Sequence, residues 1–182
     1  MSTVQKPPFR IPSNADHERI SALFLGPKAE NFGLLRECFI EVLDKQRAVR
    51  TKYFPEDKAY ITPQIKQSEA YEKQKKKLID SLDGLTNLLN KHSIPFFSPR
   101  YSAHMCTDMS MPAILGYIST MLFNPNNVAF EASPITTHLE LRVGQQLCDM
   151  FGYNTNKKLI GLPLGWGHVA CDGTIANLEA IW

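Results

Sequence analysis

The sequence predicts a mainly α-helical chain. Apolar side chains recur every three to four residues over 30–52 and again over 68–92, which is the spacing of amphipathic helices. Serine followed closely by proline, at 110–112 and at 133–134, is typical of a helix start, because proline loses nothing at the first helical position. With 43% hydrophobic and 21% charged residues, the 182-residue chain has an ordinary globular composition.

Each long helix carries an apolar seam. The seam of the first comprises Leu35, Phe39, Val42, Gln46 and Val49, and Phe54-Pro55 ends that helix. The seam of the second comprises Leu78, Leu82, Leu85, Leu89 and His92. The second seam lasts about two heptads, whereas a coiled coil needs roughly three or four. We therefore expect the two helices to pack against each other as an antiparallel pair.

Two shorter helices and two short strands follow. The helices are predicted over 111–123 and 134–151, and Gly152 is placed to end the second of them. The apolar side of that helix comprises Leu139, Val143, Leu147 and Met150. Mostly apolar, β-favouring residues predict strands at 159–160 and 168–171.

The turn at Asp172-Gly173-Thr174 has the residues of an anion site. It separates the second predicted strand from a predicted helix over 175–182. Gly173 allows the backbone to approach a phosphate closely, Thr174 adds a hydroxyl group, and a helix N-terminus presents unpaired N–H groups. Ordinary helix capping accounts for the same residues, so both interpretations remain open on this spacing alone.

Four motifs occur in a fixed order along the chain. They are Arg100-Tyr-Ser-Ala-His-Met105, Asn124-Pro-Asn-Asn-Val128, Glu131-Ala-Ser-Pro134 with Thr137 and Glu140, and Gly165-Trp-Gly-His168 continuing through Asp172-Gly173 to Glu179. Together they resemble the N-terminal part of the group II amino acid decarboxylases, which depend on pyridoxal 5′-phosphate (PLP), and most of all the bacterial-type tyrosine decarboxylases. The resemblance covers nearly the whole chain.

The resemblance implies an α/β enzyme of PLP fold type I, with a predominantly parallel central sheet. The chain would supply a mainly helical, truncated N-terminal portion of that fold. Because most of the sheet would be absent, we expect the apolar faces of the helices at 111–123 and 134–151 to be exposed and the isolated chain to be poorly soluble. Residues 1–108 would form an arm and a helical dimerisation segment, and 109–182 would begin the PLP-binding domain and stop after the phosphate turn. The family forms homodimers, and we expect the same here.

The resemblance also assigns candidate site residues. Gly173 and Thr174 align with the turn that holds the PLP phosphate, and His104 and Thr107 with positions near the substrate. A structural role for His104 is an equal alternative. Asp172 departs from many broader relatives and would repel a phosphate unless its side chain turns away to cap the helix. Three residues that the family brings towards the neighbouring active site are Asn126, Asn127 and Glu131.

The expected reaction is decarboxylation of tyrosine or a related aromatic amino acid to give the amine and CO2. In such enzymes the lysine that binds PLP covalently follows the phosphate turn, whereas every lysine of this chain lies at or before Lys158. We therefore assign no catalytic residue and expect these residues alone to be inactive. A non-catalytic dimerisation or regulatory module is the alternative.

Charge and composition argue against several other classes of protein. A net charge of +2 gives no reason to expect a nucleic-acid partner, and the basic run at 73–77 lies among acidic residues, as on a solvated helix face. The start of the chain has no apolar targeting region, so we expect a cytoplasmic protein. The uncharged stretch 109–130 is broken by prolines and asparagines and falls short of the roughly 20 apolar residues that span a bilayer. Four scattered cysteines match no metal-binding spacing, so we expect no metal site.

Overall fold

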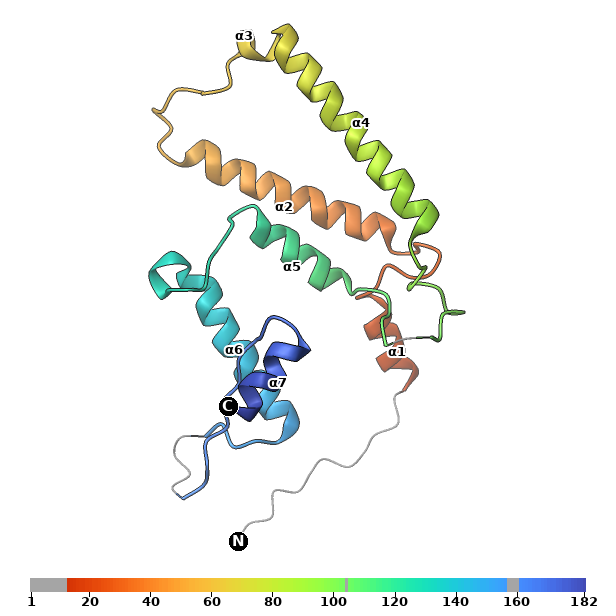
Figure 1. Cartoon of the computed structure of the whole chain (residues 1–182), viewed down its shortest axis with the longest axis vertical. Helices are drawn as coiled ribbons and strands as arrows, with labels where there is room; N and C mark the ends of the chain where they lie inside the picture. Colours follow the sequence, from red (N-terminus) through yellow and green to blue (C-terminus); the bar gives the residue numbers. More distant parts are fainter. Residues whose placement is uncertain (1–12, 104, 157–160) are drawn as a thin grey trace. The chain divides into compact units, whose positions relative to one another are not determined.

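The computed structural model describes residues 13–103, 105–156 and 161–182 (Figure 1). These residues divide into two compact units, one ending at Leu122 and the other beginning at Phe123. The first unit holds α1 (Asn14–Ser21), α2 (Phe32–Lys52), α3 (Pro63–Lys66), α4 (Glu69–His92) and α5 (Met111–Met121). The second holds the 3-10 helix η1 (Phe130–Ala132), α6 (Pro134–Phe151) and α7 (Gly173–Ile181).

The prediction of a mainly helical chain is confirmed, and all four long helices lie within two residues of their expected bounds. Helices α1 and α3 were not predicted. The strand expected at 168–171 is wrong, because no described segment pairs with it, and a strand exists only through hydrogen bonds to a neighbour. The strand expected at 159–160 lies outside the described residues. Among these residues the single β-bridge joins Phe24 to Ser110, so the parallel sheet of the family stays a prediction.

Helix α1 begins with a capping box. The Ser13 hydroxyl accepts a hydrogen bond from the Asp16 N–H at 3.3 Å, and the Asp16 carboxylate accepts one from the Ser13 N–H at 2.9 Å. Two N–H groups that the first turn leaves unpaired are thereby satisfied. The backbone and side-chain hydrogen bonds from Ser13 hold the pKa of the Asp16 carboxyl below its ordinary value.

The seam predicted for α2 is confirmed in part, and its partner is α5. Leu35, Phe39 and Val42 are half-buried, whereas Val49 is 50% exposed. Gln46 is 8% exposed, and its Nε2 donates to the Leu122 carbonyl oxygen at 2.9 Å. Arg50 donates to the same oxygen at 3.5 Å. This carbonyl lies at the C-terminal end of α5, where a helix leaves its carbonyl oxygens without partners. Side chains of α2 therefore supply hydrogen-bond donors to the end of α5, in addition to packing against it. At the other end of α5, the Met111 N–H donates to the Leu23 carbonyl at 2.7 Å.

Helix α4 does not pack on α2, so the predicted antiparallel pair is wrong. Among the described elements α4 contacts only α3, and Figure 1 shows it running apart from α2 and α5. Helix α2 packs on α5 instead. The seam leucines of α4 are consequently 54–70% exposed; they are Leu78, Leu82, Leu85 and Leu89.

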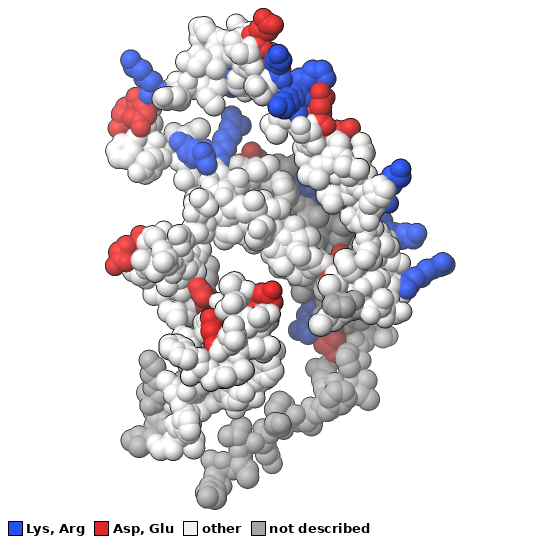
Figure 2. All heavy atoms as spheres, in the orientation of Figure 1, with Lys and Arg blue, Asp and Glu red and all other residues white. Residues whose placement is uncertain are grey.

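Lysine and arginine side chains gather along α4, with acidic side chains beside them (Figure 2). Lys76 pairs with Asp80 at 2.7 Å, and Lys75 pairs with Glu72 at 3.1 Å. Both pairs lie within one helix and are open to solvent, where such pairs contribute little. The basic run is therefore partly neutralised by acidic residues of its own helix.

Helix α6 ends as predicted, at Gly152 in the left-handed conformation with φ of 77°. Its start differs in detail from the expected serine cap. The Ser133 hydroxyl pairs with the Thr136 hydroxyl and accepts no N–H of the first turn. The buried residues of α6 are Gly144 and Cys148. Its apolar side is exposed, as expected for a face without its sheet; the residues are Leu139, Val143, Leu147 and Met150.

Candidate functional site: a phosphate-type turn and an aromatic pocket

The predicted turn forms the start of α7. Asp172 is the N-cap residue, and its Oδ1 accepts the Thr174 N–H at 3.4 Å, which confirms the predicted capping chemistry. The Asp172 carbonyl accepts the Ala176 N–H at 3.0 Å. Asp172 has φ of 100°, a region that residues with a side chain rarely adopt, so the turn holds it in a strained conformation.

The residues of this turn fit a phosphate group. A Cβ atom added to Gly173 would meet no atom within 4 Å, so the approach to the backbone is open. Behind it stands a nine-residue helix, whose first N–H groups and dipole favour an anion. The Asp172 carboxylate now occupies the Thr174 N–H and would have to release it. The start of α7 therefore suits an anion such as a phosphate group, in competition with the Asp172 carboxylate.

Segment 165–167, just before the turn, lies directly on α6. A Cβ atom added to Gly144 would overlap the Gly167 carbonyl oxygen, so only glycine permits this approach. The Gly165 N–H donates to the Asn154 carbonyl at 2.6 Å. Cys148 is buried beneath the segment. The backbone leading into the turn is therefore anchored on α6.

His168 contacts α7 across the turn. Its Nε2 lies 2.6 Å from Oε2 of Glu179, and the two side chains are 38% and 42% exposed. The Trp166 ring lies 4.9 Å from the His168 ring at a tilt of 34°. The sequence places His168 only within the motif that leads into the turn. It does not predict the contact with Glu179. The one feature of the sequence that points to it is a histidine before the Gly-Thr turn and a glutamate after it.

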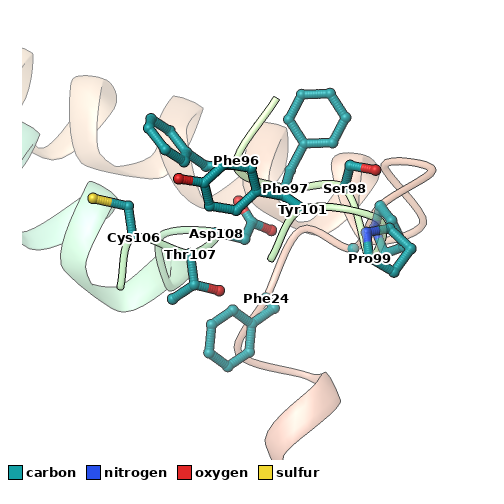
Figure 3. Close-up of a pocket in the computed structure, with 11 residues that line it drawn as sticks. Phe24, Phe96, Phe97, Ser98, Pro99, Tyr101, Cys106, Thr107 and Asp108 are labelled. Carbon is teal, nitrogen blue, oxygen red and sulfur yellow. The ribbon is translucent and has the colours of Figure 1, made fainter. Parts of the chain in front are cut away.

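An aromatic pocket lies in the first unit (Figure 3). Its volume is about 390 Å³, and its lining comes from the segment after α1 and the segment after α4. The residues labelled there are Phe24, Phe96, Phe97, Ser98, Pro99, Tyr101, Cys106, Thr107 and Asp108. The Phe96 and Tyr101 rings meet edge to face at 5.0 Å. Thr107 thus lines a cavity, whereas His104 lies outside the described residues.

The side chain of Asn127 forms hydrogen bonds with residues of α6, in its own unit. Its side chain donates to Glu140 at 2.7 Å and accepts from Thr136 at 2.5 Å, which fixes the loop before α6. Asn126 accepts the Val128 N–H at 3.0 Å. These contacts give both asparagines structural roles, and a contribution of Asn126, Asn127 or Glu131 to a neighbouring active site stays a prediction.

Among the described residues, no three His, Cys, Asp or Glu side chains converge as metal ligands would. None of the helices in that part of the chain has the length and apolarity needed to cross a bilayer.

No protein-family model matches this chain. It is 37% identical over 164 residues to the L-tyrosine decarboxylase of Enterococcus faecalis, and 38% and 37% identical to those of Levilactobacillus brevis and Enterococcus faecium. Each match covers 90% of this chain and 25% of the relative, so the chain spans a quarter of the length of the curated relatives it matches. The chain is thus similar over most of its length to part of the L-tyrosine decarboxylases, and the motif order fits an N-terminal portion of such a protein.

Proposed function

We propose that the chain forms the N-terminal portion of a PLP-dependent decarboxylase, which releases CO2 from L-tyrosine or a related aromatic amino acid to give the amine. The observation that carries the proposal is the 37–38% identity, over 90% of this chain, to three proteins named L-tyrosine decarboxylase. The α/β architecture of fold type I and a homodimeric assembly belong to the same proposal.

The phosphate turn has the clearest role in this proposal. Bound PLP supplies the electron-accepting ring on which decarboxylation depends. The backbone N–H groups at the start of α7 and the Thr174 hydroxyl hold its phosphate, and the lack of a side chain at Gly173 allows the close approach. The chain offers no lysine after this turn, so we propose that these 182 residues contribute anchoring and no covalent bond to the cofactor.

The aromatic pocket is the proposed contribution to substrate binding. Its volume of about 390 Å³ is in the range of small-molecule sites, roughly 300–1,000 Å³. Aromatic side chains such as Phe96 and Tyr101 line the pocket, and an aromatic substrate ring can pack against such side chains. Thr107 lies in the lining, and His104 belongs to the same stretch of sequence.

The phosphate assignment is tested by Gly173→Ala, with Gly84→Ala in α4 as the matched control. Neither added methyl group meets an atom within 4 Å, so neither disturbs the fold. We expect Gly173→Ala to weaken the binding of PLP and of inorganic phosphate by tenfold or more, and Gly84→Ala to leave both unchanged. Titration of the protein expressed from its full natural reading frame measures both affinities. Equal affinities for the two variants would remove Gly173 from the site.

The lack of covalent catalysis by these residues has its own test. The 182-residue polypeptide, incubated with PLP and L-tyrosine, should form no amine above the rate without protein. Reading the transcript past the Trp182 codon provides the complementary result, because a lysine-bearing continuation would supply the missing role. Amine formation by the 182 residues alone would contradict the proposal.

A non-catalytic dimerisation or regulatory module is the second candidate, and the exposed leucines of α4 favour it. A contiguous apolar face of this kind marks a protein-binding surface. Titration into a full-length tyrosine decarboxylase separates the two candidates. Only the regulatory module predicts a specific hetero-complex that changes the activity of the partner.

A further inference from the structure

Helix α7 is held by very little apolar packing. Its apolar side chains are exposed, with Ile175 at 38%, Leu178 at 58% and Ile181 at 85%. Burial of apolar area is what normally fixes the direction of a helix, so polar contacts matter more for α7 than for a packed helix. Among the described residues, His168–Glu179 is the side-chain hydrogen bond that joins segment 161–171 to α7.

The two partners enclose the phosphate turn between them. His168 lies four positions before Asp172, and Glu179 lies in the last turn of α7, so their contact closes a loop around Gly173 and Thr174. One side of this loop is anchored, because Gly167 lies on Gly144 of α6. The other side is α7 itself, whose first N–H groups move with the helix.

We propose that His168 and Glu179 are positioning residues for the cofactor phosphate. This inference rests on the proposed function of Gly173 and Thr174. The hydrogen bond ties α7 to the segment anchored on α6, and so fixes where the first N–H groups of α7 point. The Trp166 ring lies 4.9 Å from the His168 ring, whose Nε2 faces the Glu179 carboxylate. Loss of the bond leaves the turn chemically intact but able to swing, which weakens phosphate binding.

Two conservative variants of Glu179 distinguish the effect of the position of its acceptor oxygen from the effect of its charge. Glu179→Gln keeps an acceptor oxygen at the same reach and removes the charge, whereas Glu179→Asp keeps the charge and withdraws the oxygen from His168. A net hydrogen bond corresponds to roughly two- to tenfold in affinity. We expect Glu179→Gln to bind PLP and inorganic phosphate within about twofold of the unmodified protein. Glu179→Asp and His168→Phe should each lose about two- to tenfold.

A spectroscopic signal reports the bond directly. The 182-residue polypeptide has two tryptophans, so this measurement uses that polypeptide with Trp182→Phe, which leaves Trp166, beside His168, as the sole emitter. In that background, Glu179→Asp should change the Trp166 emission without any ligand, and Glu179→Gln should not. Combining His168→Phe with Glu179→Asp should weaken binding no further than the worse single variant, because both remove one interaction.

The binding titrations use the protein expressed from its full natural reading frame, with far-UV circular dichroism to verify helix content. Losses that add in the double variant, or equal losses for Glu179→Gln and Glu179→Asp, would overturn the positioning role. Binding that falls in Gly173→Ala and stays constant in Glu179→Asp would overturn this inference and leave the proposed function standing. If the unmodified protein bound neither PLP nor phosphate, both would fall.

Discussion

Asp172 occupies the place that an anion would take at the start of α7. Its carboxylate accepts the Thr174 N–H, and its φ of 100° shows that the turn tolerates strain there. An aspartate cap stabilises a helix, yet the same negative charge opposes a phosphate at the same amide. Asp172 therefore stabilises α7 when no phosphate is bound, and it lowers the affinity of the turn for a phosphate.

Replacing Asp172 by asparagine should strengthen phosphate binding. The amide oxygen still accepts the Thr174 N–H, while the repulsive charge is removed. We expect the affinity for inorganic phosphate to rise by about three- to tenfold, in line with the 0.3–1 kcal/mol of a charge near a helix terminus plus direct repulsion. Calorimetric titration measures this change, and the exposed Asp44→Asn on α2 controls for net charge. An equal rise in both variants would contradict the argument.

The Asp16 carboxyl should titrate below its ordinary pKa of 3.8. Because the folded-state pKa is depressed, the stabilisation it gives α1 is present above pH 3.8 and is lost as the pH falls through the lower folded value. A carboxyl ¹³C titration by NMR follows it. Ser13→Ala should move the midpoint back towards 3.8, because the side-chain hydrogen bond is removed. A midpoint unaffected by this substitution would contradict the capping-box assignment.

At the scale of elements, contacts between helices depend on details that periodicity does not contain. The seam of α2 could be predicted from spacing, but its partner could not, because a seam specifies a buried side without specifying what covers it. Gln46 decides the outcome, since it binds the Leu122 carbonyl at the end of α5. Likewise α6 buries Gly144 and Cys148, while its leucines are exposed.

Gly144→Ala should destabilise the second unit. The added methyl group overlaps the Gly167 carbonyl oxygen, which belongs to backbone and cannot rotate away. Overpacking of this kind costs about 1–3 kcal/mol. Gly116→Ala in α5 is the control, because its Cβ meets no atom within 4 Å and alanine favours a helix by about 0.5–1 kcal/mol. Thermal unfolding followed by circular dichroism should show opposite shifts, and a neutral Gly144→Ala would refute the contact.

At the scale of the molecule, the helical class and the position of the phosphate turn could be predicted from sequence, because both are encoded locally. The aromatic pocket could not, because Phe24 and Tyr101 are brought together from distant segments. The His168–Glu179 contact also escaped prediction, since it depends on how the turn directs α7. His104 lies outside the described residues, and its role stays a prediction.

The leucine face of α4 should control self-association. If this face forms the proposed homodimer interface, Leu82→Lys with Leu85→Lys buries two charges there and should weaken the dimer by more than tenfold, since each lost leucine contributes about 1.5–3 kcal/mol when fully buried. Asn90→Lys, which lies off the leucine seam, is the control. Analytical ultracentrifugation of the protein expressed from its full reading frame measures the change. An unaffected dimer would exclude this face.

Because segment 165–167 lies close to α6, the rates at which a thiol reagent labels two cysteines of the second unit can report how often this segment opens. Cys148 is 4% exposed beneath Gly165 and Gly167, whereas Cys171, just beyond the same segment, is open to solvent. A thiol reagent reaches Cys171 at once but reaches Cys148 only when the segment lifts from the helix. The ratio of the two labelling rates therefore reports the opening equilibrium, and with it how firmly the backbone leading to the phosphate turn is held.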